Sequence, residues 1–328
     1  MMGLNIKHIV GFVILCLALI ALPWMVGEFE LRLISQIACF SLFVLSFTIL
    51  YGHAGLLSFG QAAYFGVGAY VCALAFKYVA GMPFLAAILL GAIAAGIAAW
   101  LIGMFCVKLT GAYFSLLTVA FSQFLFAIAF KWRSVTGGDD GLVVSKNPIT
   151  LPFGGSIDTM NTTSMYYLIL LIVVLCYLAC LWLTKTPFWN MVRCCKENDE
   201  RASFVGYNTY MTKVLAFTIA GFFGGVGGAL FAINESFVST DVIDMNRSFV
   251  CLMMAFIGGA NSIIGSVIGA AIYTVLTDMI SKYTPYWELI LGCLFIIIIL
   301  FFRDGFVSLL PKARALMSKW KTATGKEN

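Results

Sequence analysis

Long apolar runs alternate with polar connections along almost the whole chain. A run of about 20 apolar residues is long enough to cross the roughly 30 Å hydrocarbon core of a bilayer as a helix. The pattern predicts about ten spans, of which the eighth is short. They cover residues 9–26, 33–51, 56–76, 84–107, 112–130, 165–184, 214–233, 249–260, 263–278 and 287–302. We therefore expect an all-α integral membrane protein, a polytopic helical bundle.

Two longer polar stretches interrupt this pattern. Residues 131–164 are rich in Gly, Thr and Asn and predict a large loop. Residues 185–213 contain the charged run 196–206, in which Asn198 or Asp199 can cap a helix that Gly206 ends. A helix of about seven residues is roughly 10 Å long and is not stable alone. The charged run therefore predicts a short helix that docks on a partner, with a solvated loop as the alternative.

The distribution of cations sets the orientation. With the N-terminus inside, thirteen of the twenty Lys and Arg residues fall on the inner side and seven on the outer side. The positive-inside rule therefore predicts that both termini and the charged connection are cytoplasmic. Residues 9–26 have the basic start of a secretory signal, but no small-residue cleavage pattern follows, so we count them as a span.

Composition supports a single membrane domain over residues 1–328. Hydrophobic residues make up 62% of the chain and charged residues 11%, against about 45–50% and 25% in soluble domains. The net charge of +5 is explained by the inner cations, so lipid rather than nucleic acid is the expected surrounding. Eight of the ten cysteines lie in apolar runs, and their spacing indicates neither disulfides nor a metal site.

The spans lack the residues that several kinds of chemistry require. An ion-driven carrier usually needs ionisable groups at membrane depth, but Lys77, Lys108, Asp278 and Glu288 all lie at span ends. The chain has no phosphate-binding loop, zinc spacing or nucleophile elbow. We therefore expect a non-enzymatic translocation pathway, without a cofactor of its own, whose energy comes from elsewhere.

A glycine-rich stretch over residues 51–70 has two interpretations. Small residues three to five apart allow helices to approach closely. Alternatively, the glycines interrupt a helix so that polar groups line a passage, which is tolerated only where protein or water covers the backbone. The second interpretation predicts a pathway formed by Gly55, Ser58, Gly60, Gln61 and Gly66. Residues 221–228 and 258–269 carry similar glycine clusters.

A second motif opens the large outer loop. Residues 136–141 read Thr-Gly-Gly-Asp-Asp-Gly, a composition typical of turns. The alternative is an external docking or gating element. It would be formed by Thr136, Gly137, Gly138, Asp139 and Asp140.

Several motifs together resemble one family. Glu200-x-Ala202-x-x-x-Gly206 is similar to the Glu-Ala-Ala-x-x-x-Gly loop of permeases in ATP-driven (ABC) importers, with Arg201 in place of the first Ala. With the motifs at residues 55–62, 110–114, 136–141 and 302–306, residues 31–310 resemble the membrane subunits of branched-chain amino acid importers of the LivM type. Residues 1–30 and 311–328 then form an additional N-terminal span and a basic cytoplasmic tail.

This resemblance implies an assembly in a bacterial inner (plasma) membrane. The implied partners are a second homologous permease, two cytoplasmic ATPase subunits that carry ATP and Mg²⁺, and an external or periplasmic substrate-binding protein. The resemblance assigns ATPase coupling to Glu197, Glu200, Arg201, Ala202 and Gly206.

Three alternatives remain. Urea or short-chain amide importers look similar over the same length, and residues 201–208 are reminiscent of that branch. The others are a gradient-driven secondary carrier and an integral-membrane enzyme, both disfavoured by the missing chemistry.

Overall fold

A computed structural model describes residues 22–24, 26–79, 81–144, 149–150, 156–157, 161–301 and 305. Most of the predicted first span, the basic tail over residues 311–328 and the 302–306 motif except Gly305 lie outside the described residues. The predicted placement of both termini in the cytoplasm therefore falls outside them too.

Each of the other nine predicted spans corresponds to a helix. They are α2 (Glu28–Phe47), continued by the π-helical turn Thr48–His53, then α3 (Gln61–Tyr78), α4 (Phe84–Cys106), α5 (Gly111–Lys131), α7 (Thr162–Leu183), α10 (Thr209–Glu235), α11 (Met245–Gly258), α12 (Ile263–Ser281) and α13 (Trp287–Phe301). Within the described residues, six are long and apolar enough to cross a membrane: α2 with its π-helical turn, α4, α5, α7, α10 and α12. The expected all-α, polytopic fold is confirmed.

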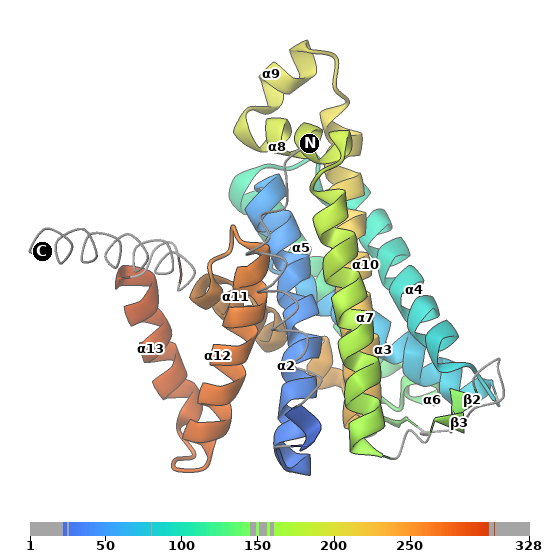
Figure 1. The fold of residues 1–328 in the computed structure, drawn as a ribbon. Coiled ribbons are helices and arrows are strands. Elements are labelled where there is room, and N and C mark those ends of the chain that lie inside the picture. Colours follow the sequence, from blue (N-terminus) through green and yellow to red (C-terminus); the bar gives the residue numbers. More distant parts are fainter. Residues whose placement is uncertain are drawn as a thin grey trace, which may run out of the picture.

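The two polar stretches lie at opposite ends of the bundle (Figure 1). One end carries the charged connection, folded into α8 (Pro187–Glu197) and α9 (Asp199–Phe204). The other carries α6 (Arg133–Thr136) and short elements of the outer loops. These are the 3-10 turns Gly138–Asp140 and Thr240–Val242 and the antiparallel pairs of β1 (Leu142–Val143) with β4 (Phe237–Val238) and β2 (Ile149–Thr150) with β3 (Ser156–Ile157). A further 3-10 turn, Leu22–Trp24, precedes α2.

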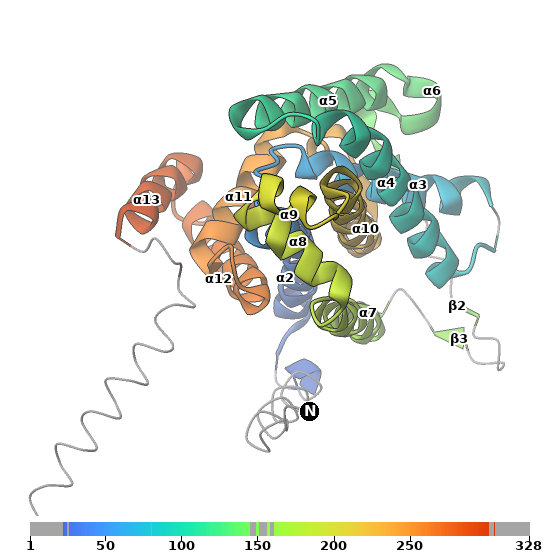
Figure 2. The ribbon, with the colours of Figure 1, turned by 90° about the horizontal axis from the view of Figure 1, so that it is seen from above.

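Helices α2 and α10 form the core of the bundle. Their most apolar stretches are 72% and 78% buried, against 28% for α5 and α7. Figure 2 shows the other helices arranged around these two. Helix α4 turns a stripe of Leu, Ile and Trp side chains outward, including Leu89, Ile93 and Trp100. An exposed apolar surface of this kind indicates contact with lipid.

Glycines bring α3 and α10 into close contact, as the packing interpretation predicts. A Cβ atom on Gly228 of α10 would overlap the backbone carbonyl of Phe65 in α3. One on Gly68 of α3 would overlap the backbone of Gly225. Because a main-chain neighbour cannot rotate away, these positions exclude any side chain.

Several predicted helix boundaries were wrong, for two physical reasons. Helix α3 begins at Gln61 instead of residue 56, because residues 55–60 are not helical. Helices α10 and α11 begin four or five residues before their apolar runs, because polar N-caps extend them. The Asn208 side chain accepts a hydrogen bond from the Met211 amide (3.0 Å) and the Asp244 side chain accepts one from the Met245 amide (2.7 Å).

The α3–α10 contact generates a stability prediction. Replacing Gly228 with Ala forces the α3 backbone away and should cost about 1–3 kcal/mol. Gly292→Ala on α13 is the matched control, since a Cβ atom there meets nothing within 4 Å. Thermal unfolding of the purified protein in detergent should show a lower midpoint for Gly228→Ala only. Equal midpoints for the two variants would contradict the close contact.

Candidate functional site

The non-helical segment 55–60 lies inside the bundle, and hydroxyl groups of other helices bond to its backbone. Helix α5 supplies two of these groups and α11 supplies one for the first turn of α3. Ser115 Oγ donates to the Leu57 carbonyl (2.6 Å), the Phe59 amide donates to Thr118 Oγ1 (3.2 Å), and the Ala62 amide donates to Ser248 Oγ (3.0 Å). The backbone groups that lack helical partners are therefore satisfied by side chains, as an apolar environment requires.

Four of the five predicted pathway residues are buried in this region. Ser58 Oγ accepts a hydrogen bond from the Gly60 amide (3.3 Å), and Gln61 Oε1 accepts one from Ser46 Oγ of α2 (3.2 Å). Gly66 is buried one turn further along α3. Gly55 is exposed and lines a cavity of about 530 Å³ between segment 55–60 and the start of α5. The structure thus gathers Ser58, Gly60 and Gln61 at the start of α3 and places Gly55 at a cavity.

The charged connection contains the expected capped helix. Asn198 is the N-cap of α9 and accepts a hydrogen bond from the Arg201 amide (2.9 Å). Gly206 follows the helix with φ of +95°, a left-handed conformation that favours glycine. Of the predicted coupling residues, Ala202 is buried, and the other four are exposed. They are Glu197, Glu200, Arg201 and Gly206.

Two apolar side chains at the end of α9 are uncovered. Phe204 is 87% exposed and Val205 is 73% exposed. Phe204 ends α9 and Val205 follows it, and α9 lies at the far tip of the charged end, beyond the body of the bundle (Figure 1). Adjacent exposed apolar side chains on a water-facing helix indicate a protein contact surface.

The sequence analysis missed α8, which fixes α9 to the bundle. Thr186 and Pro187 begin this helix, and Trp189, Val192 and Cys195 bury one face at helical spacing. The Trp189 ring contacts the His53 ring edge-on, with centroids 5.1 Å apart. Two signals in this mostly polar connection could have predicted α8. One is the apolar residue at every third position from Trp189 to Cys195, and the other is the Thr186-Pro187 start.

Lys196, at the end of α8, joins three parts of the chain. Its Nζ donates to the carbonyl of Gly52 (2.6 Å), at the end of the π-helical turn, and to Asn261 Oδ1 (3.4 Å), between α11 and α12. Its side chain also lies against Gly55, where a Cβ atom would come within 2.9 Å of Lys196 Cγ. Lys196 therefore links the charged connection directly to the start of the non-helical segment 55–60, which we call the interrupted segment.

An ion pair holds the start of α9 against α10. Asp199, at the start of α9, pairs with Lys213 in the first turns of α10. With the contacts of α8, this pair fixes both ends of the connection, so α8 and α9 form one unit on the bundle. We refer to residues 187–206 as the α8–α9 unit.

The predicted external motif forms a compact turn at the opposite end. Thr136 Oγ1 donates to the Trp132 carbonyl (2.9 Å) and accepts from the Gly138 amide (3.3 Å). Glycines 137, 138 and 141 take the positive φ angles of the turn, and the side chains of Asp139 and Asp140 are exposed. The turn and the docking interpretation are thus compatible: the glycines shape the backbone and two carboxylates face outward.

Comparisons with known proteins give consistent similarities. A family model described as "Branched-chain amino acid transport system / permease component" matches residues 30–300. The high-affinity branched-chain amino acid permease LivM of Salmonella typhimurium is 24% identical over 95% of this chain and 77% of its own length. LivM of Escherichia coli is 25% identical over the same shares. The guanosine permease NupQ of Bacillus subtilis is 28% identical over 34% of each chain. No solved structure matches the chain.

The α8–α9 unit also allows a test of orientation. Cys194 is exposed on α8, whereas burial raises the pKa of the neighbouring Cys195 thiol, which keeps it protonated and unreactive. A membrane-impermeant maleimide should therefore label Cys194 in inside-out vesicles but not in right-side-out vesicles. The same label on Cys194→Ser identifies the background from other thiols. Labelling of Cys194 in right-side-out vesicles would place the α8–α9 unit outside the cell.

Proposed function

Because the chain belongs to the branched-chain amino acid transport system permease family, we propose that it forms half of the pathway of an ABC importer for branched-chain amino acids. The other half is a second, homologous permease. Two cytoplasmic ATPase subunits, with ATP and Mg²⁺, drive the cycle, and an external binding protein delivers cargo. The assembly lies in a bacterial inner membrane.

The observation that carries this proposal is the α8–α9 unit itself. Its outer end presents the uncovered side chains of Phe204 and Val205, and its inner end holds the Gly52 carbonyl through Lys196. A movement of α9 is therefore transmitted to the interrupted segment through direct contacts. This is the arrangement that a pathway without its own motor requires.

The chemistry of the tip fits a protein partner. Burying a large apolar side chain contributes about 1.5–3 kcal/mol, so Phe204 is the expected anchor in an ATPase groove. Glu197, Glu200 and Arg201 precede this anchor in the chain and add exposed charges of both signs. Charges at the edge of an interface mainly select the partner and its orientation. Gly206, with open space around it, permits the close turn after α9.

The interrupted segment provides the moving part. Two hydroxyl groups on α5 bond to its backbone and one on α11 bonds to the Ala62 amide just after it. A hydroxyl can exchange one acceptor for another by rotation. A shift of Lys196 toward or away from Gly52 can therefore rearrange residues 55–61 without unfolding a helix. Ser58, Gln61 and the glycines Gly55, Gly60 and Gly66 form the pathway that opens in this step.

The external turn at residues 136–140 supplies a contact for the binding protein. Asp139 and Asp140 are exposed on the glycine turn, where they can pair with cations of that protein. Branched-chain amino acids are the proposed cargo because both LivM relatives match this chain nearly from end to end. A comparison of leucine uptake with urea uptake by the assembled importer tests the cargo directly. Uptake of urea without uptake of leucine would refute the amino acid assignment.

Truncating the anchor tests the ATPase contact. Phe204→Ala should weaken binding of the ATPase subunits by about tenfold or more, because interface aromatics are frequent hot spots, and uptake should fall in parallel. Tyr283→Ala is a matched control, since Tyr283 is an aromatic that is 88% exposed at the opposite end. Co-purification and ATP-dependent uptake in proteoliposomes measure both effects. Unchanged ATPase binding in Phe204→Ala would remove this contact from the proposal.

Replacing the linking lysine tests transmission. Lys196→Met keeps the aliphatic chain but loses the hydrogen bond to the Gly52 carbonyl. The ATPases should still bind, but uptake per ATP hydrolysed should fall by about tenfold or more, because a charged hydrogen bond is lost. Arg193→Met is the control: Arg193 is an exposed cation on the same helix. Normal uptake per ATP in Lys196→Met would show that force reaches the segment by another route.

A further inference from the structure

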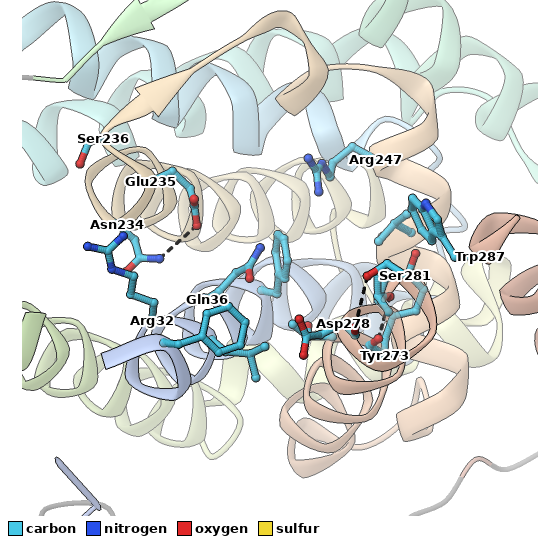
Figure 3. Close-up of a pocket in the computed structure, with 16 residues that line it drawn as sticks. Arg32, Gln36, Asn234, Glu235, Ser236, Arg247, Tyr273, Asp278, Ser281 and Trp287 are labelled. Atoms are coloured by element: carbon cyan, nitrogen blue, oxygen red, sulfur yellow. Dashed lines mark hydrogen bonds between the residues drawn. The ribbon is translucent and has the colours of Figure 1, made fainter. Parts of the chain in front are cut away.

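A cavity of about 590 Å³ is drawn in Figure 3. Its lining includes the first turns of α2, which lie at the end of the bundle opposite the α8–α9 unit (Figure 1). Five helices form its walls: the first turns of α2, the end of α10, the start of α11, the last turns of α12 and the start of α13. By the predicted orientation this is the external side. The cavity is therefore open to a molecule arriving from outside, and the pathway residues predicted above do not line it.

Arg247 of α11 lies in the cavity wall. Three carboxylates act on it from beyond ion-pair distance, those of Asp241, Glu235 and Asp244. Its guanidinium lies over the rings of Phe40 and Phe231, at 5.7 and 5.8 Å from their centroids. Within the described residues no carboxylate forms an ion pair with it. The two rings stack on each other, with centroids 5.4 Å apart, so the guanidinium lies beside this pair. Among the residues that the structure describes, its N–H groups make no side-chain hydrogen bond. These groups have the geometry that binds a carboxylate through two parallel hydrogen bonds.

The same cavity holds a carboxylate that also lacks a cation. Glu235, at the end of α10, accepts a hydrogen bond from Asn234 Nδ2 (3.2 Å), but pairs with no cation in the described part of the chain. By contrast, Asp278 in the same cavity is neutralised by Lys282 (2.7 Å). Opposite charges at Arg247 and Glu235 thus share one cavity without pairing with each other.

The rest of the lining adds a polar group and an apolar wall. Thr274 is 6% exposed, and its hydroxyl has no hydrogen-bond partner among the described residues. A buried hydroxyl without a partner costs free energy that a bound ligand can recover. Leu33, Val250 and Trp287 supply apolar surface next to the polar groups. Arg32 of α2 lines the same cavity and is drawn beside Asn234 in Figure 3. The cavity therefore offers cationic, anionic and apolar contacts together.

We propose that this cavity binds a zwitterionic α-amino acid before it enters the pathway. The Arg247 guanidinium binds the α-carboxylate, Glu235 binds the α-ammonium group, and the side chain of the amino acid packs against Leu33, Val250 and Trp287. The inference rests on the proposed function for its cargo class, and it adds the residues that hold the cargo. A ligand carrying both charges satisfies both unpaired groups, whereas a simple anion or cation leaves one of them unpaired.

The test uses the complete importer in nanodiscs of phosphatidylcholine, without the binding protein. Equilibrium binding of radiolabelled leucine should weaken at least tenfold in Arg247→Gln and less in Arg247→Lys, which keeps the charge but not the planar fork. Lys77→Gln is the control, because Lys77 is an exposed cation outside the cavity, and its leucine affinity should match the wild type.

Analogues separate binding from a structural role. The wild type should prefer leucine over leucinamide, which lacks the carboxylate, and Arg247→Gln should lose that preference. Glu235→Gln should instead lose the preference for leucine over 4-methylpentanoate, which lacks the ammonium group. Weaker binding with both preferences retained would overturn the inference, as would the absence of leucine binding by the wild type.

A phospholipid headgroup is the competing ligand. If phosphatidylethanolamine, which also carries both charges, bound at Arg247 and leucine failed to displace it, the amino acid site would be refuted. ATP-dependent leucine uptake by the wild type, measured with the binding protein present, tests the proposed function separately. Normal uptake with an unchanged KM in Arg247→Gln would refute the cavity alone.

Discussion

The structure depends on one constraint: backbone polar groups inside an apolar bundle must find hydrogen-bond partners. Residues 55–60 leave the helical pattern, so their backbone groups need partners from other elements. Hydroxyl groups of Ser115, Thr118 and Ser248 provide them. Helices α5 and α11 are thereby fixed against the start of α3. Helix α3 in turn packs closely on α10, at Gly68 of α3 and Gly228 of α10. The interruption is thus stabilised by tertiary contacts, and those contacts can change.

The same constraint explains the position of the α8–α9 unit. The π-helical turn at residues 48–53 ends a helix, so its last carbonyl groups lack helical donors. The ammonium group of Lys196 supplies a donor to Gly52, and Trp189 covers the adjacent His53 ring. The α8–α9 unit therefore supplies hydrogen-bond partners to the end of the π-helical turn, and a movement of one rearranges the contacts of the other.

Much of this fold could be predicted from the sequence, because apolar length alone defines spans. Helix α4 begins at the predicted residue, Phe84, since Pro83 precedes a continuous apolar run. The boundaries at Thr209 and Met245 were missed because polar caps, and not hydropathy, set them. The capped helix α9 was predicted by local chemistry.

The bond from Lys196 to Gly52 joins residues 144 positions apart, and no local pattern encodes such a pairing. Arg247 was counted only as a loop cation, because its aromatic partners come from α2 and α10.

The central claim is that the α8–α9 unit and the interrupted segment move together. Hydrogen exchange of the Phe59 and Ala62 amides, measured in the assembled importer with and without ATP, tests it most directly, because these amides bond to Thr118 and Ser248. The account predicts that ATP binding changes their protection, while amides within α4 keep theirs. Protection that is identical with and without ATP, in an importer that transports, would contradict the account.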